Sequence, residues 1–572
     1  MEKINRLKKL LIQHGLDGYI IPKNDEFFGE YIEENRDKLK YISKFSGSYG
    51  LALILKNKNY LFVDGRYSLQ AKMQSGKFFK IAVMPYKIPS NILGKRKLRI
   101  GYDPKLHTTN NLQIFFKKTE CKLFPVQQNL IDKIWDKKDK SVVKKFYVLP
   151  KNAVDQNYNY KINKLINILK SKKIDLQFIT ASENIAWLLN IRGQDSNFSP
   201  IPNSYLTLGI DKKIYLFCNL KKVDKIFIKK LRNIKIVNIK DTSLFLSKVK
   251  NKRILIDSSS CSIHFERILI RNNKLVQFLD PIYSLKSVKT NKEIKNIIKS
   301  HIHDGVALTK FLIWLKKNYI KRSINEISAQ KRLLKFRKEN KDFKFSSFPS
   351  ISASGPNGAI IHYRATKKTN RKLKRGDIYL IDSGGQYNFG TTDVTRTISL
   401  GNKDLKIKNI FTRVLKGHIA VASFKLRNNT RGAQIDRLAR KFLRNIKLDY
   451  AHGTGHGVGY FLNVHEGPQA LTKKNSEKLR EGMILSNEPG YYKNGKFGIR
   501  IENLVRIKKF RNIKIFDNLT MAPIDKSLIN KDILKKDEIN WLNKYHKKVF
   551  MNLKKFMNKI EFEELKRSCS KI

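Results

Sequence analysis

Four carboxylates and one imidazole in the last third of the chain are of the types that bind divalent metal ions. They are Asp382 in IDSGGQY, Asp393 in TTDVTRT, His456 in HGTGHGVG, Glu488 in SNEPGYY and Glu502 in IRIEN. Such an oxygen-rich set suits two hard divalent ions that share bridging carboxylates, and paired ions activate water between them. These residues alone predict a metallohydrolase.

The first acidic pair is expected on one β-hairpin. IYLIDSG and DVTRTISL have the composition of strands, and the turn-rich GGQYNFGTT separates them. A turn centred between Tyr387 and Asn388 would place Asp382 directly opposite Asp393. Opposed residues on antiparallel strands have Cβ atoms about 4.5–5.5 Å apart, so two such carboxylates can hold ions about 3.5–4 Å apart.

The second acidic pair repeats this arrangement. Glu488 and Glu502 lie symmetrically about Gly495, which follows Asn494, and Asn-Gly is the strongest short hairpin signal. Four converging carboxylates would repel one another and raise one another's pKa unless cations were present. Taken alone, each of these acidic residues would ordinarily be a solvated or salt-bridged surface group. Two symmetric acidic pairs together with a glycine-flanked histidine are poorly explained by coincidence.

Three more histidines lie in the same part of the chain. His362 is in GPNGAIIHYRAT, His452 opens HGTGHGVG, and His465 is in NVHEGP. Each could be an ordinary core or surface histidine. Because glycine-rich backbone lets a ligand approach closely, we expect them to act as proton relays and oxyanion partners.

Composition excludes several classes of protein. At 572 residues the chain is expected to form several domains, and a hydrophobic content of 41% argues against wholesale disorder. The formal charge of +69 would suit a nucleic-acid partner, but Lys and Arg are spread along the whole chain without an RNA-binding aromatic motif or zinc finger. We interpret the charge as a solvated, Lys-rich surface and expect no specific nucleic acid, with non-specific polyanion binding at low salt left open.

Redox state and location are predicted from what the sequence lacks. The cysteines (Cys121, Cys218, Cys261 and Cys569) are isolated, which argues against a disulfide framework or a zinc ribbon. The N-terminal segment has no uninterrupted apolar core of signal-peptide type, and no run of about 18 apolar residues occurs. We therefore expect a cytoplasmic protein with no membrane span.

The pattern of apolar, polar and glycine residues divides the chain into successive regions. Two α/β regions come first, and their similar alternation of helices and strands suggests a duplicated fold. NIAWLLNIRG (184–193) is expected to be a helix that ends at Gly193, and residues 286–317 a long helix. Glycine-rich turns and short strands with all candidate ligands follow. A helical tail then carries Trp541, Leu542, Tyr545, Val549 and Phe550, which either cover the catalytic region or join two subunits.

Motifs along nearly the whole chain resemble the M24 "pita-bread" metallopeptidases, and among them the three-domain Xaa-Pro aminopeptidase (aminopeptidase P) subfamily. They include GLDGYIIPKNDEFFGEYI, ENIAWLLNIRG, FPSISASGPNGAIIHY and MAPID, besides the five ligand motifs and NVHEGP. The resemblance implies an α/β and α+β multidomain fold. Two creatinase-like N-terminal α/β domains, a pita-bread catalytic domain and a short C-terminal helical extension are expected at 1–140, 141–285, 286–510 and 511–572.

The resemblance also implies a role for each matched residue. Asp382 would bind one metal, Asp393 and Glu502 would bridge both, and His456 and Glu488 would complete the second. Arg500 would orient the acidic ligands from the same strand face as Glu502. His362 and His465 would contact the substrate and the developing oxyanion, and His452 would hold the proline side of the peptide or shuttle a proton.

The activity implied is removal of an N-terminal residue from peptides whose second residue is proline. A hydroxide held by two divalent ions would attack the scissile carbonyl, and Glu488 would take and return a proton. The family usually uses manganese, and the ligand set is also compatible with cobalt or zinc. A homodimer is expected. The alternatives are a prolidase, which cuts only Xaa-Pro dipeptides, and a non-catalytic pita-bread module that binds peptide or nucleic acid. A methionine aminopeptidase is disfavoured, because its chemistry does not need the long N-terminal regions.

Overall fold

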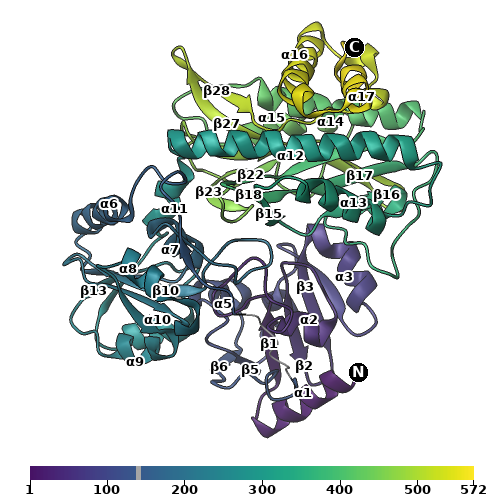
Figure 1. Ribbon diagram of the computed structural model, residues 1–572. Coiled ribbons are helices and arrows are strands. Elements are labelled where there is room, and N and C mark those ends of the chain that lie inside the picture. Colours follow the sequence, from purple (N-terminus) through teal and green to yellow (C-terminus); the bar gives the residue numbers. More distant parts are fainter. Residues whose placement is uncertain (137–142) are drawn as a thin grey trace. The chain divides into compact units, whose positions relative to one another are not determined.

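The computed structural model describes residues 1–136 and 143–572, and the predicted boundary at residues 140 and 141 lies outside these described residues. The chain forms two compact units (Figure 1). The first unit contains residues 1–150 and 156–283, and the second contains residues 151–155 and 284–572. Among the described residues, no helix has both the length and the apolar character that crossing a bilayer requires.

The first unit begins with a six-stranded mixed sheet in the order β4-β3-β2-β1-β5-β6. Its strands are β1 (Gly18–Pro22), β2 (Leu51–Leu55), β3 (Asn59–Asp64), β4 (Lys80–Met84), β5 (Arg99–Tyr102) and β6 (Lys122–Pro125). Its helices are α1 (Glu2–Gln13), α2 (Lys38–Ser43), α3 (Ser68–Ser75), α4 (Pro89–Leu93) and α5 (Thr109–Phe116). Tyr19 and Ile21 join one apolar core while Ile20 joins another, so both faces of the sheet are covered and its central strands are apolar throughout.

A second sheet in the same unit has the matching order β12-β11-β10-β8-β13-β14. Its strands are β8 (Leu176–Ile179), β10 (Ser204–Gly209), β11 (Ile214–Cys218), β12 (Lys235–Asn238), β13 (Arg253–Ile256) and β14 (Lys274–Gln277). Its helices are α6 (Tyr158–Ser171), α7 (Ser182–Leu188), α8 (Lys225–Lys230), α9 (Thr242–Ser247), α10 (Ile263–Leu269) and α11 (Pro281–Ser287). Strand directions also correspond pair by pair, which confirms the suggested duplicated fold.

Two predicted helices are wrong in extent. Helix α7 ends at Leu188, not Gly193, because Asn190 takes a left-handed conformation (φ 55°) and β9 (Ile191–Arg192) then pairs with β7 (Tyr147–Val148). The expected helix at 286–317 is interrupted after α11. Helix α12 (Asn291–Asn318) starts anew at the cap residue Thr290, whose hydroxyl and Glu293 form a capping box.

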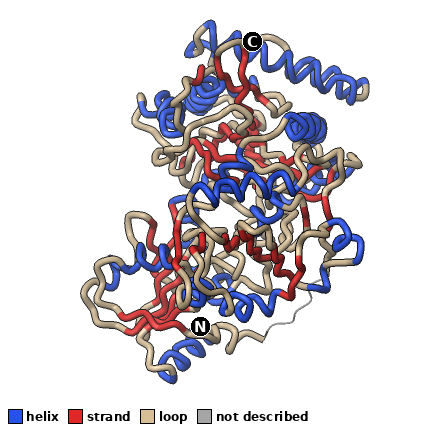
Figure 2. Tube along the Cα trace, turned by 90° about the vertical axis from the view of Figure 1, so that its left-hand side faces the viewer, coloured by secondary structure: helices blue, strands red, loops and turns tan. Residues whose placement is uncertain are grey.

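The second unit packs helices against short antiparallel sheets (Figure 2). Helix α12 packs on α13 (Glu326–Lys338), and α14 (Leu405–Ala422) packs on α15 (Gly432–Arg444). The strands are β15 (Phe343–Ser346), β16 (Ile351–Ser354), β17 (Ile378–Ser383), β18 (Gly385–Tyr387), β19 (Gly390–Thr391), β20 (Val394–Ser399), β21 (Lys425–Leu426), β22 (Gly455–Gly457), β23 (Glu466–Leu471), β24 (Ile484–Asn487), β25 (Gly490–Lys493), β26 (Phe497–Arg500), β27 (Asn503–Phe510) and β28 (Ile513–Asn518).

The C-terminal tail folds back on its own chain as α16 (Lys536–Leu553) and α17 (Lys559–Cys569), drawn in yellow in Figure 1. Leu542, Tyr545 and Val549 are buried in one core with residues of α14 and β26. The tail therefore packs on the rest of the second unit, in agreement with one of the two expectations.

His546 of α16 makes the stability of this core depend on pH. The side chain is fully buried, its Nε2 accepts from the backbone N–H of Ile524 (3.2 Å), and burial lowers its pKa to about 3. An unfolded histidine titrates near 6.5, so on acidification the unfolded chain binds the proton first. The contribution of His546 to the free energy of unfolding should therefore fall by up to about 1.4 kcal/mol per pH unit between about pH 6 and pH 3.

Denaturant midpoints at pH 7 and pH 5 test this effect. His546→Gln, which keeps an acceptor for Ile524, should lose less stability over this interval than the wild type does. His14→Gln, at an exposed position of the N-terminal domain, should behave as the wild type. An unchanged pH dependence in His546→Gln would contradict the assignment.

Candidate metal centre

The five candidate ligands come from strands or strand ends of the second unit. Asp382 is in β17, Asp393 directly precedes β20, and His456 is in β22. Glu488 follows β24, and Glu502 lies between β26 and β27. Short strands separated by glycine-rich turns thus bring residues that are distant in sequence to one place.

The predicted register of the first hairpin is wrong by two residues. Asp382 pairs with Thr395, not with Asp393. The residues expected to form a broad turn instead extend the hairpin as β18 and β19, which pair through Gln386 and Thr391. The chain therefore reverses at Asn388 and Phe389, one residue later than expected. Asp393 becomes a diagonal neighbour of Asp382, still on the same face of the sheet.

The predicted register of the second hairpin is confirmed. Gly490 pairs with Arg500 in the β25/β26 ladder, and Asn487 pairs with Asn503 in the β24/β27 ladder. Both pairings are symmetric about Gly495, which has a left-handed backbone (φ 69°) that glycine adopts without strain. Glu488 and Glu502 occupy the gap between the two ladders, at symmetric positions.

The ligand atoms form three overlapping clusters in which all members lie within 4.8 Å of one another. Asp382, Asp393 and Glu502 form one cluster, and His456, Glu488 and Glu502 form the second. The third joins Asp393 and His456 to His465. His456 Nε2 lies 3.5 Å from Asp393 Oδ2 and 3.5 Å from Glu488 Oε1. Glu502 is shared by the first two clusters, as a bridging carboxylate would be.

The electrostatics of the centre favour a cation. Burial, reinforced by neighbouring carboxylates, raises the pKa of Asp393 to about 6 and that of Glu502 well above its usual range. Burial opposes protonation of His456, but the hydrogen bond to Asp393 and the charge of Glu488 outweigh it and raise its pKa to about 9. Asp382 Oδ1 is buried and has no hydrogen-bond partner among the described residues. A divalent pair would satisfy this oxygen and remove the repulsion, so the donors fit such a group.

Arg500 connects the acidic ligands to the surrounding strands. Its Nη2 donates to Asp382 Oδ2 (2.6 Å), its Nε to Thr395 Oγ1 (3.0 Å) and its Nη1 to Tyr492 Oη (2.7 Å). The Tyr492 hydroxyl is also 2.8 Å from His452 Nε2. A continuous chain of contacts therefore runs from Asp382 to His452, whose Nδ1 lies 4.0 Å from Glu488 Oε2.

Sequence reasoning missed the hydroxyls that orient the ligands. Thr395 Oγ1 donates to Glu502 Oε2 (2.8 Å), and Ser486 Oγ donates to Glu488 Oε1 (3.1 Å). Both lie two residues from a candidate ligand on an extended segment, and this spacing could have identified them. Tyr492 gave no such signal, because its partner His452 is 40 residues away in the sequence.

The remaining histidines differ in their placement. His465 is exposed, and its ring centroid lies 4.2 Å from that of His456. His452 is half-buried and bonded to Tyr492. His362 follows a 3-10 turn (Gly355–Ala359) and is half-buried, and among the described residues it belongs to none of the three clusters.

Comparison with protein families and known proteins gives a consistent result. The model of metallopeptidase family M24 matches residues 295–509, and the model of its C-terminal region matches residues 514–572. Models of the creatinase/prolidase N-terminal domain match residues 3–134 and 137–293. Among relatives, Xaa-Pro aminopeptidase 1 of Dictyostelium discoideum is 36% identical, covering 96% of this chain and 92% of its own length. Xaa-Pro aminopeptidase ApepP of Drosophila melanogaster is 34% identical, covering 97% and 96%.

Solved structures extend the comparison to the fold. The X-prolyl aminopeptidase from Caenorhabditis elegans, described as a cytosolic enzyme with a di-nuclear active site, superimposes with a TM-score of 0.93. It is 29% identical and covers 100% of this chain and 99% of its own. A prolidase from Pyrococcus horikoshii matches only 64% of this chain, with a TM-score of 0.51 and 25% identity. Similarity to aminopeptidases of this kind over the full length shows that the chain belongs to metallopeptidase family M24.

Proposed function

We propose that this protein is a metal-dependent Xaa-Pro aminopeptidase, which removes the first residue of peptides that have proline in second place. The main support is the share of the chain that aligns with each kind of relative. Relatives named as Xaa-Pro aminopeptidases align over nearly their whole length and ours, whereas the prolidase fold accounts for 64% of this chain. A shorter dipeptidase such as this prolidase would not need the second creatinase-like domain or the C-terminal extension.

The proposed ligands would hold two divalent ions. Asp382 would bind one ion, His456 and Glu488 the other, and Asp393 and Glu502 both. The overlapping clusters and the shared Glu502 support this division. Two such ions polarise a peptide carbonyl and lower the pKa of water enough for attack near neutral pH. Manganese is proposed as the metal, with cobalt or zinc also compatible with these donors.

The side chains around the proposed ions would handle protons and the substrate. Glu488 would take a proton at a carboxylate oxygen and return it to the departing proline nitrogen, and Ser486 holds that carboxylate in place. His465, exposed beside His456, would face the developing oxyanion, and His362 would contact the substrate. His452 would transfer protons or hold the proline side, supported by the contact with Tyr492.

Proline in second place explains why a dedicated site is needed. Its peptide bond carries no N–H and its φ is fixed, so enzymes that bind substrates through extended backbone hydrogen bonds accept it poorly. A centre that binds the free amine through acidic groups does not depend on that N–H. The proposed division into domains 1–140, 141–285, 286–510 and 511–572 is supported by the duplicated sheets and the four matched segments. A homodimer in the cytoplasm is also proposed.

A small peptide panel tests the proposed activity. The purified protein, analysed for bound metal, should cleave an Xaa-Pro-Yaa tripeptide at least about tenfold faster than the Xaa-Pro dipeptide or an Xaa-Ala-Yaa tripeptide. Removal of metal with a chelator should abolish cleavage, and manganese should restore it. Exclusive cleavage of the dipeptide would make the protein a prolidase, and a protein without metal or activity would be a binding module.

A further inference from the structure

Arg396 in β20 is a buried cation that the proposed reaction does not use. Its side chain is 1% exposed, and its guanidinium makes hydrogen bonds to six uncharged groups. The acceptors are Pro523 O (3.0 Å), Thr395 O (2.9 Å), Glu502 O (2.7 Å), Asn503 Oδ1 (2.8 Å), Ala522 O (2.8 Å) and Tyr545 Oη (2.9 Å). None of its hydrogen bonds within the described residues goes to a carboxylate, and burying a charge without such a partner is costly. An arginine with a purely packing role could be replaced by an apolar residue at less cost.

The acceptors divide into two groups by their place in the fold. Thr395, Glu502 and Asn503 belong to the strands around the proposed metal centre, whereas Ala522, Pro523 and Tyr545 belong to the C-terminal segment. Arg396 therefore joins the extension directly to the backbone of a proposed bridging ligand. Glu502 accepts two hydrogen bonds that fix it. Thr395 Oγ1 donates to its side-chain carboxylate (2.8 Å), and Arg396 donates to its backbone carbonyl (2.7 Å).

Helix α16 supplies the other side of this junction. The Tyr545 hydroxyl lies 2.8 Å from Ala522 O besides its contact with Arg396, and its ring stacks on Trp541 at 5.4 Å between centroids. Trp541 meets His418 of α14 edge to face, at 5.9 Å. His418 Nδ1 donates to Asn487 O (3.1 Å), and Asn487 Nδ2 donates back to His418 O (2.9 Å). Asn487 directly precedes Glu488, so α16 also supports the second acidic strand.

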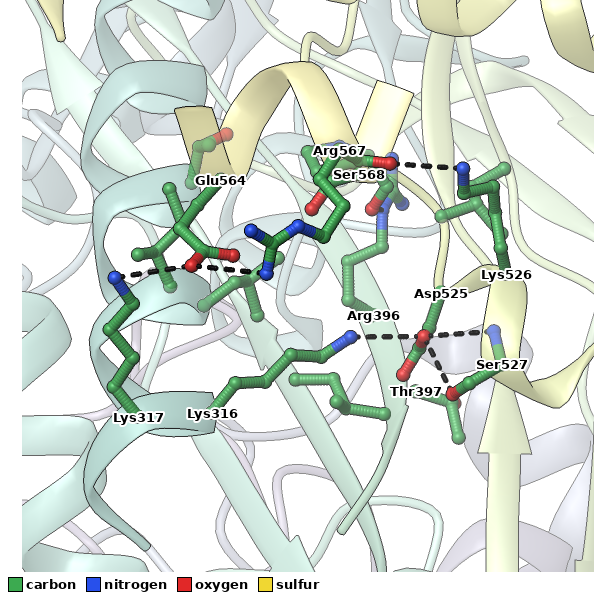
Figure 3. Close-up of a pocket in the computed structure, with 16 residues that line it drawn as sticks. Lys316, Lys317, Arg396, Thr397, Asp525, Lys526, Ser527, Glu564, Arg567 and Ser568 are labelled. Atoms are coloured by element: carbon green, nitrogen blue, oxygen red, sulfur yellow. Dashed lines mark hydrogen bonds and ion pairs between the residues drawn. The ribbon is translucent and has the colours of Figure 1, made fainter. Parts of the chain in front are cut away.

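The same segment is fixed at the end of β20, beside a cavity of about 330 Å³ that Figure 3 shows. Asp525 accepts from the backbone N–H of Ser399 (3.0 Å) and from Lys316 of α12 (3.0 Å). Lys317 of α12 pairs with Glu564 of α17 at 3.2 Å. The extension is thus attached to β20 and to α12, so its position relative to Arg396 is defined from several sides.

We propose that the C-terminal extension positions the metal ligands through Arg396. Tyr545 and the carbonyls of residues 522 and 523 hold the guanidinium, and the guanidinium fixes the position of the Glu502 backbone. In the same way, Trp541 and His418 fix the position of the strand that carries Glu488. Arg396 and Tyr545 are positioning residues, since neither touches the proposed ions. This inference rests on the proposed metal ligands. It gives the extension a role in metal retention.

The experiment uses the full chain and two conservative variants. Arg396→Lys keeps the charge but loses the planar array of donors, and Tyr545→Phe removes only the hydroxyl. Two matched controls lie in the first unit. Arg192 is also 1% exposed and donates to the carbonyls of Ala186 (3.0 Å) and Ile191 (2.8 Å), so Arg192→Lys makes the same change. Tyr205→Phe removes a hydroxyl that donates to Glu26 O (2.9 Å) in a side chain as buried as Tyr545, both 4% exposed.

Metal affinity, measured by competition with a chelator well below the melting temperature, is the deciding readout. Arg396→Lys should weaken manganese binding by about 10–100-fold and Tyr545→Phe by about tenfold, as substitutions behind metal ligands do, whereas the controls should bind as the wild type. Excess manganese should restore most of the kcat of Tyr545→Phe with little change in KM. A merely structural role would lower Tm without this rescue.

Each result has a definite meaning. Variants that melt earlier but bind manganese as tightly as the wild type would overturn the inference and leave the proposed function intact. If Arg396→Lys does not fold, the affinity of Tyr545→Phe decides alone. A wild-type protein that binds no manganese would overturn the proposed function, and this inference with it.

Discussion

Asp393→Ala is expected to purify with less than half of the wild-type metal and to cleave an Xaa-Pro-Yaa peptide at least about a thousandfold more slowly. Asp393 belongs to two of the three ligand clusters and lies 3.5 Å from His456, so its loss removes a donor from both proposed ions. Because the two ions act together on water and on the carbonyl, loss of either should remove most of the rate enhancement. Metal analysis and tripeptide turnover on the same preparation measure both effects.

The stability of this variant distinguishes loss of the site from loss of the fold. Without metal, removing one carboxylate from a crowded buried cluster relieves repulsion, so the metal-free variant should unfold no earlier than the metal-free wild type. Asp404→Ala is the control. Asp404 is exposed and caps α14 through the backbone N–H of Lys406 (2.7 Å), so its loss should cost about 1 kcal/mol of stability without changing turnover. Full metal content and full activity in Asp393→Ala would refute the bridging role.

The two hairpins show how far the sequence alone can place such a site. The Asn494-Gly495 dipeptide allows one compact turn, and the register predicted from it is correct. GGQYNFGTT offers several turns, and the paired β18 and β19 select one that depends on the third strand β15, which is distant in the sequence. The error of two residues did not displace the site. Side chains alternate with a period of two, so Asp382 and Asp393 stay on one face.

The residues that sequence analysis missed are of two kinds. Thr395 lies two residues from Asp393, a spacing that could have identified it. Tyr492 contacts His452, 40 residues away, and Arg396 contacts Tyr545, 149 residues away, and no local pattern reveals such pairs. The residue types of the ligands and their spacing are local features, so the sequence was sufficient to predict the candidate ligands. The supporting contacts depend on tertiary packing, as does the early end of α7 at Leu188, where Asn190 adopts a backbone conformation that helical periodicity does not predict.

Arg500→Lys should lower kcat by about a hundredfold while KM changes far less, a loss typical of groups that orient metal ligands. Arg500 is 2% exposed and divides its donors among Asp382, Thr395 and Tyr492. An ammonium is a single point of charge and cannot reach all three. Lysine can keep the charge beside Asp382, so metal should be retained better than in Asp393→Ala, but Tyr492 would lose the donor that fixes it against His452.

Arg506→Lys provides the matched comparison on the neighbouring strand. Arg506 in β27 donates from Nε to Asp517 (2.9 Å), is half-buried and contacts none of the candidate ligands among the described residues. Its variant should keep wild-type kcat and metal content. Wild-type kcat in Arg500→Lys would show that charge beside Asp382 is sufficient and that the geometry of the guanidinium is not used. A large fall in kcat in both variants would instead indicate a general sensitivity of the β26/β27 region. The two results together therefore separate orientation of the ligands from simple charge balance.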